Sequence, residues 1–206
     1  MSVFDFLAPK NRVPLAGSSH LRVFLCHASE DKAAVRKLYK ALQRDGCSPW
    51  LDEESLVAGQ KWQDEIPKAV GATDVVLVCL SNHSTAKDGY IQREIALALD
   101  EVAKKPNGSI FLIPVLLEKC LIPERLGSWH SVNYFEQDGY KRLLIALSVR
   151  AHELTQLRDK RYKDLAAMAN ARGHYFLSSV SISKCRNCGR YLETAAMNNC
   201  PKARAK

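Results

Sequence analysis

The stretch Arg22-Val-Phe-Leu-Cys-His-Ala-Ser-Glu-Asp-Lys32 has the pattern of a buried strand that breaks into a polar loop and then opens a helix. In open α/β folds, ligands bind at the carboxyl edge of the sheet, where such loops lie. Helix N-termini at this edge also offer backbone N–H groups to anionic ligands. We therefore expect residues 27–31 to border a binding site.

Apolar runs and helical periodicities alternate along the chain on both sides of this stretch. Strands are expected at 21–26, 48–52, 74–81, 110–117 and 131–135, and helices at 31–44, 60–70, 88–104 and 140–154. Gly46 is expected to end the first helix. Strands that alternate with helices of this length predict an α/β fold, with a parallel, doubly wound sheet and right-handed crossovers.

The charge is distributed unevenly and suggests how the chain is divided. The net charge is +8, but residues 1–150 carry 19 Lys and Arg against 18 Asp and Glu, whereas residues 151–206 carry 11 against 4. We expect an N-terminal extension at 1–20, one domain at 21–150, and a basic extension at 151–206 that begins as a helix over 151–171 and ends it at Gly173.

The composition narrows the classes of protein. No apolar run approaches the roughly 18 residues of a membrane span, and the N-terminus lacks the pattern of a secretory signal, so a cytoplasmic location without membrane contact is expected. Cys26, Cys47, Cys79 and Cys120 are then reduced packing residues. The tyrosines of the basic extension are too scattered to form a stacking platform, so nucleic acid is not an expected partner.

Three sequence boxes carry a family resemblance. They are Phe24-Leu-Cys-His-Ala-Ser-Glu-Asp31, Trp50-Leu-Asp-Glu-Glu-Ser-Leu-Val-Ala-Gly59 and Tyr90-Ile-Gln-Arg-Glu-Ile95, and over residues 20–150 their order and spacing resemble those of bacterial Toll/interleukin-1 receptor (TIR) domains. The resemblance implies a flavodoxin-like, five-stranded parallel sheet flanked by helices. It also implies, as in many bacterial members, cleavage of NAD to nicotinamide and ADP-ribose or a cyclic product, in bacterial immune, antiviral or stress signalling.

Glu94 falls on the position of the catalytic glutamate in TIR enzymes. From the residues alone, Glu94 is a carboxylate near the start of a helix, where an acid interacts favourably with the helix dipole. The resemblance reverses this interpretation and makes Glu94 the predicted catalytic residue.

Further residues are expected to line an NAD site because they lie in the three boxes or follow the third strand. They are His27, Ala28, Ser29, Trp50, Asp52, Ser81, Asn82 and Tyr90. Several have structural alternatives: Ser29 is a good helix N-cap, Ser81 and Asn82 suit a turn, and Tyr90 suits core packing. His27 has no nucleophilic partner assigned by the sequence and is interpreted as a neighbour of the site.

The loop at 52–61 exposes Leu56 and Val57 among polar residues, which favours a partner surface. The resemblance implies self-association through this loop, with other TIR or effector proteins as further partners. A non-catalytic TIR scaffold therefore stays open as the alternative function. A phospho-receiver is weaker, because Ser81 occupies the place of its acceptor aspartate.

The basic extension contains Cys185-Arg-Asn-Cys188, which has the spacing of a structural zinc knuckle, and Cys200 follows twelve residues later. A complete site needs a fourth ligand, either His174 or a residue of another chain. The alternative is a set of reduced thiols without a metal.

Overall fold

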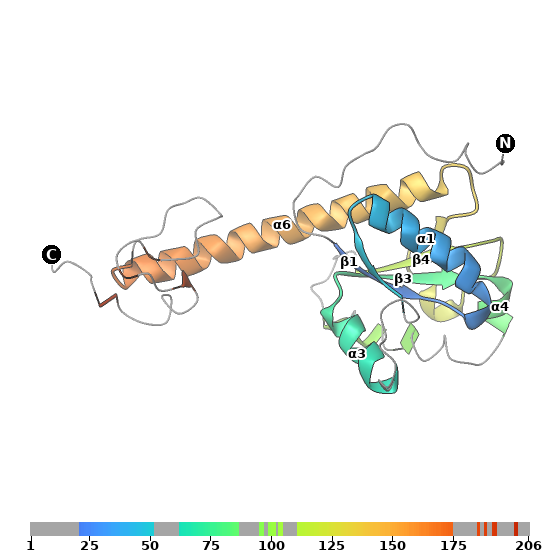
Figure 1. Cartoon of the computed structure of the whole chain (residues 1–206), viewed down its shortest axis with the longest axis horizontal. Helices are drawn as coiled ribbons and strands as arrows, with labels where there is room; N and C mark the ends of the chain where they lie inside the picture. Colours follow the sequence, from blue (N-terminus) through green and yellow to red (C-terminus); the bar gives the residue numbers. More distant parts are fainter. Residues whose placement is uncertain are drawn as a thin grey trace. The chain divides into compact units, whose positions relative to one another are not determined.

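The structure is a computed structural model of the 206-residue chain (Figure 1). It describes residues 21–51, 62–86, 95–96, 99–101, 103–104, 111–174, 185, 188, 191–192 and 200–201. The chain divides into two compact units, Met1–His152 and Glu153–Lys206, and each is described by itself.

The first unit contains a five-stranded parallel sheet. Its strands are β1 (Arg22–Cys26), β2 (Ser48–Trp50), β3 (Val75–Leu80), β4 (Leu112–Leu116) and β5 (Val132–Asn133), in the order β2-β1-β3-β4-β5. All four pairings are parallel. Every residue of β3 and β4 is buried, which explains why both strands are apolar throughout. The predicted flavodoxin-like sheet is confirmed.

Helices cover both faces of the sheet (Figure 1). They are α1 (Lys32–Arg44), α3 (Trp62–Ala72), α4 (Asn82–Ala86) and α6 (Gly139–Ala171), with short 3₁₀ turns η2 (Ser29–Asp31) and η3 (Glu124–Leu126). Residues 95–96, 99–101 and 103 are also helical. Figure 1 shows α1 and α3 on opposite sides of the sheet, as a doubly wound fold requires.

The core follows from the alternation of side chains along each strand. On the α3 face, Phe24 of β1 and Val76 of β3 pack with Ile66 and Val70 of α3. Leu38 and Leu42 of α1 are also fully buried, on a helix whose apolar residues recur on one side. The hydroxyl of Tyr140 donates to Asp45 Oδ2 at 2.6 Å and joins the start of α6 to the end of α1.

Gly46 ends α1 as predicted. Its φ is +87°. The Gly46 N–H donates to the Gln43 carbonyl at 3.1 Å, and the Cys47 N–H donates to the Leu42 carbonyl at 3.0 Å. This pair of bonds is the Schellman motif, in which glycine reaches the left-handed region without steric cost.

Two local expectations were wrong. Asn82 was expected to suit a turn, but residues 82–86 form the short helix α4. Ser29 is the first residue of η2 and not a cap, since Ala28 and Asp31 occupy the cap positions of η2 and α1, and neither makes a side-chain cap bond. The Ser29 hydroxyl donates instead to Glu30 Oε2 at 2.9 Å.

In the second unit, α6 continues to Ala171, which agrees with the predicted helix over 151–171. Gly173 has a φ of +78°, and the N–H groups of Gly173 and His174 donate to the carbonyls of Asn170 and Ala169. The predicted helix end is therefore a second Schellman motif. In the described part of the chain, no helix is both long and apolar enough to cross a membrane.

Asp74 joins the starts of β1 and β3, at the opposite edge of the sheet from the polar loops. Its carboxylate accepts hydrogen bonds from the Arg22 backbone N–H (2.9 Å), Arg22 Nε (3.0 Å) and Arg22 Nη2 (2.8 Å). Burial works to raise the pKa of Asp74, but these bonds, with the charges of Arg22 and Arg150, hold its pKa below the ordinary value.

The Asp74→Asn variant is expected to be less stable by about 1 kcal/mol at neutral pH, since the pair is partly exposed. A depressed folded-state pKa contributes stability above the unfolded pKa of about 4, and this contribution is lost as the pH falls through the folded value. Urea unfolding gives the free energy of unfolding at pH 6 and at pH 3. Between these two values, it should fall less for Asp74→Asn than for wild type. The exposed control Asp100→Asn should follow wild type; parallel curves for all three proteins would contradict the assignment.

Candidate functional site

The strand order places a topological switch point between β1 and β3. From β1 the chain moves to β2 on one side, and it then returns to β3 on the other. In flavodoxin-like sheets of this order, ligands bind at the carboxyl ends of these two strands. The relevant segments are 27–31 after β1 and 81–86 after β3, and we call them the switch-point edge.

The residues predicted after β1 divide between the interior and the surface. His27 is only 4% exposed, and its Nδ1 lies 3.3 Å from the Leu25 carbonyl oxygen. Ala28 is buried in the core cluster on the α3 face, whereas Ser29 is exposed. Ser29 is therefore accessible to a ligand, while His27 and Ala28 contribute mainly to packing beside the edge.

Ser81 links the two halves of the switch-point edge. Its buried hydroxyl donates to Asp31 Oδ2 at 2.7 Å. The same oxygen accepts from the backbone N–H groups of His83 (3.1 Å) and Ser84 (3.2 Å) at the start of α4. Ser84 Oγ in turn accepts from the Ser81 N–H at 2.7 Å, which completes a reciprocal capping arrangement. Ser81 thus holds the edge together.

Asn82 makes a second connection, to the segment after β4. Its backbone N–H and its Nδ2 both donate to Glu118 Oε1, at 2.8 and 3.0 Å. Asp31 lies in the segment 27–31 that was expected from the sequence to border a site, whereas Glu118 was not predicted. Both come shortly after the end of a buried strand, and that position is the feature that points to them.

Cys120 lies near the acidic side chains of Glu118 and Asp31, and they affect its pKa. Burial raises the pKa of its thiol, and the charges of Glu118 and Asp31 raise it further. The thiol therefore stays protonated at neutral pH, and the protonated form is the less reactive one.

Trp50 ends β2 and lies against the core. Its ring stacks on Phe24 with centroids 4.9 Å apart and planes 14° from parallel. Phe24 is buried, whereas Trp50 is only partly buried. One face of the indole is thus used in packing against the core.

The Ser81→Ala variant is expected to destabilise the first unit by about 2 kcal/mol, because it removes a helix cap and a hydrogen bond to a buried carboxylate. The matched control Ser29→Ala, at an exposed serine of the same edge, should change stability by less than about 0.5 kcal/mol. Urea unfolding of the full chain measures both variants. Equal stabilities would mean that the Ser81 hydroxyl does not hold the edge together.

Three predicted NAD-site residues lie outside the described residues: Glu94, Tyr90 and Asp52, the last with the whole loop 52–61. The residue after Glu94 is described. Ile95 is helical, fully buried and part of the core cluster on the α3 face.

The structure brings together the cysteines predicted in the basic extension. Cys185, Cys188 and Cys200 join His174, and the four potential ligand atoms all lie within 4.8 Å of one another. His174 was one of two candidates for the fourth ligand, and it belongs to the same unit as the cysteines.

Residues 23–145 match the family model described as "TIR domain". The match covers more than half of the chain and includes all five strands of the sheet except Arg22, the first residue of β1. The chain belongs to the TIR domain family.

Individual relatives agree with this membership. The chain is 28% identical over 123 residues to "NAD(+) hydrolase TcpA" of Theionarchaea archaeon (strain DG-70-1), covering 59% of this chain and 32% of that protein. It is 27% identical over 118 residues to "Uncharacterized protein y4cD" of Sinorhizobium fredii (strain NBRC 101917 / NGR234), covering 57% of this chain and 18% of that protein. The chain therefore matches a third or less of the length of these curated relatives.

The fold has a counterpart among solved structures. The TIR domain of the Toll-related receptor TRR-2 from Hydra magnipapillata superposes with a TM-score of 0.50 at 18% identity, covering 59% of this chain and 94% of that one. This likeness concerns the fold alone.

Proposed function

We propose that this protein cleaves the bond between nicotinamide and ribose in NAD, with Glu94 as the catalytic residue. The observation that carries the proposal is the similarity over 123 residues to an NAD(+) hydrolase, within a chain whose residues 23–145 match the TIR family. The products are nicotinamide and either ADP-ribose or a cyclised form. The proposed setting is bacterial immune or stress signalling.

The chemistry requires one carboxylate. Nicotinamide leaves as a neutral base from a cationic pyridinium, so no general acid is needed to protonate the leaving group. Positive charge builds up on the ribose in an oxocarbenium-like transition state, as in other glycosyl transfers. A carboxylate held beside the ribose stabilises this charge by electrostatic preorganisation.

The switch-point edge supports this proposal by its position and polarity. Asp31, Ser81 and Glu118 bring polar groups to the carboxyl ends of three neighbouring strands. Ser29 and Asn82 are exposed there, as are Glu30 and His83, and we assign Ser29 and Asn82 contacts with ribose hydroxyls or phosphates. His27 and Trp50 would border the site without taking part in the reaction.

Self-association is part of the proposed mechanism. We propose that the loop 52–61 contacts a neighbouring TIR domain, of this chain or of another TIR or effector protein, and completes or blocks its active site. Specific activity should then rise with protein concentration. A strictly monomeric species with constant specific activity would contradict this step.

A second candidate is a TIR scaffold without catalysis. Two observations favour it: the Ser81 hydroxyl is engaged in three internal hydrogen bonds, and Ala28 is packed in the core. Both residues were predicted to contact NAD, yet both have structural roles.

Incubation of the purified full chain with NAD, with and without a crowding agent, tests the two candidates. Chromatography of the products should show nicotinamide with ADP-ribose or its cyclic form, in larger amounts when the protein is crowded. Failure to release nicotinamide under any condition that produces oligomers would reject the enzyme and leave the scaffold.

A further inference from the structure

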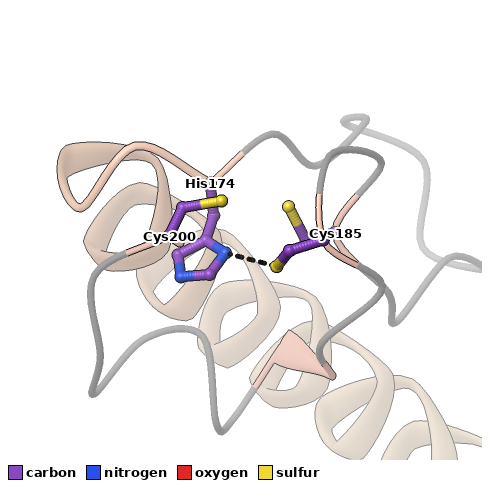
Figure 2. A group of neighbouring side chains, drawn as sticks. His174, Cys185 and Cys200 are labelled. Carbon is purple, nitrogen blue, oxygen red and sulfur yellow. Dashed lines mark hydrogen bonds between the residues drawn. The ribbon is translucent and has the colours of Figure 1, made fainter. Parts of the chain in front are cut away.

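The C-terminal extension gathers four metal-binding side chains at the end of α6. Figure 2 shows His174, Cys185 and Cys200 close together beside this helix. Cys188 completes the group, with its Sγ 3.4 Å from His174 Nδ1. In a tetrahedral zinc site with Zn–S near 2.3 Å and Zn–N near 2.0 Å, sulfur and nitrogen lie about 3.5 Å apart. The spacing of the group, within 4.8 Å for every pair, is thus close to that of a metal centre.

The backbone brings two of these ligands to the helix end. Gly173 turns the chain through its left-handed conformation, and the His174 N–H closes the motif on the Ala169 carbonyl at 3.1 Å. The carbonyl of Arg172, the residue before Gly173, accepts a hydrogen bond from the Cys200 N–H at 2.8 Å. Positions 26 residues apart are therefore held side by side by main-chain bonds.

The other two ligands come from a knuckle. Cys185 and Cys188 have the Cys-x-x-Cys spacing that lets two sulfurs of one turn reach the same ion. Cys185, Cys200 and His174 are 2%, 6% and 3% exposed, and Cys188 is partly buried. The four ligand atoms are thus largely shielded from solvent, as expected for a structural site.

A hydrophobic cluster surrounds the four ligands. Among the described residues it consists of Ala169, Leu192, Cys185 and Cys200, with Tyr162, Leu165, Ala166 and Cys188 packed against them. By its length alone, a unit of residues 153–206 falls in the size range where a metal or disulfides usually supplement the core. The seven cysteines, all within the described part of the chain, form no disulfide.

We propose that His174, Cys185, Cys188 and Cys200 bind one Zn²⁺ ion as a structural site that folds the C-terminal extension. Three thiolates and one imidazole favour zinc among the common divalent ions. Four protein ligands fill a tetrahedral shell and leave no position for a substrate, so the site is structural and not catalytic. Binding requires the three cysteines as thiolates and releases their protons, so affinity falls as the pH is lowered.

The site has a charge that suits its surroundings. Three thiolates and a neutral histidine around Zn²⁺ leave one net negative charge. The extension of residues 151–206 carries 11 Lys and Arg against 4 Asp and Glu, a net charge of +7, which offsets it.

Metal analysis of the purified full chain tests the proposal. Wild type is expected to contain about one zinc per chain, whereas Cys188→Ser and His174→Ala should each retain less than about a tenth of that amount. Cys120→Ser is the matched control, because Cys120 is also partly buried but lies in the first unit; it should keep the wild-type content. Iron in place of zinc, or full zinc content in both ligand variants, would overturn the assignment.

A second variant separates ligation from folding. His174→Cys creates a four-cysteine set and should bind one ion, unlike His174→Ala. If His174 only supported the fold, cysteine at this position would not bring back ion binding. After removal of zinc with a chelator, titration with Co²⁺ should give the intense sulfur-to-cobalt absorption of a tetrahedral thiolate site in wild type and His174→Cys. Absence of this absorption in wild type would overturn the proposal. Neither measurement depends on NAD cleavage.

Discussion

Replacement of Glu94 by glutamine is expected to lower the rate of NAD cleavage on the order of 10²–10⁴-fold, the usual effect of removing one catalytic group. Glutamine keeps the size of the side chain but loses the negative charge that would stabilise the oxocarbenium-like transition state. A factor of this size corresponds to about 3–5 kcal/mol of transition-state stabilisation. Because the charge is needed most at the transition state, kcat should fall more than KM rises.

The measurement is the initial rate of nicotinamide release by folded Glu94→Gln and Glu94→Ala under conditions in which wild type is active. Glu124→Gln is the matched control, since Glu124 is an exposed glutamate at the start of η3. It should retain the wild-type rate. Near-normal cleavage by a folded Glu94→Ala protein would reject Glu94 as the catalytic residue, even if the protein proved to be an NAD-cleaving enzyme.

Replacement of Gly139 by alanine is expected to destabilise the protein by about 3 kcal/mol. Gly139 is the first residue of α6, and a turn at residues 134–138 joins it to β5. A Cβ at this position would lie 2.7 Å from the Tyr134 Cα and 2.8 Å from the Tyr134 carbonyl oxygen, and it would also clash with the Asn133 carbonyl oxygen. These are all backbone atoms, so no side-chain rotation relieves the overlap.

The clash has a defined structural consequence. The Tyr134 N–H donates to the Leu116 carbonyl at 2.9 Å, next to the pairing of β5 with β4. Movement of Asn133 and Tyr134 would therefore strain the edge strand of the sheet. Leu143 and Leu147, fully buried on the first turns of α6, hold the helix against the core and oppose its displacement.

Gly71 provides the matched control for Gly139. It lies near the end of α3, and a Cβ there meets no atom within 4 Å. Gly71→Ala should therefore stabilise the protein by about 0.5–1 kcal/mol, since alanine loses less conformational freedom than glycine in a helix. Urea unfolding of both variants gives the comparison. Stability changes of the same sign would contradict the packing seen at Gly139.

Part of the candidate site could be predicted from the sequence, because it follows from where strands end. His27, Ser81 and Asn82 each come within two residues of a buried strand and lie at the carboxyl edge as expected. Their roles could not be predicted in the same way. The Ser81 hydroxyl contacts Asp31, 50 residues away, and Asn82 contacts Glu118, 36 residues away. Neither contact leaves a periodic pattern in the sequence.

Ser29 shows why a local rule can fail. Serine is a strong N-cap residue, and the position before a helix favoured that role. The chain instead begins a 3₁₀ turn at Ser29, which moves the start of α1 to Lys32 and turns the hydroxyl toward Glu30. The helix start therefore differs from the expected one by a single turn of backbone. A cap preference worth about 1 kcal/mol is not enough to fix where that turn begins.

The sequence by itself determined the features that depend on near neighbours. The apolar run of β3 specified a buried parallel strand, Gly46 and Gly173 specified helix ends, and the three boxes specified the TIR family. These follow from burial periodicity and backbone conformation, which a residue imposes on its own segment. Only the tertiary structure decided that Ser81 is an internal link, and that His174 is the fourth member of the cysteine cluster. Both depend on which distant segments meet, and that is a property of the folded chain.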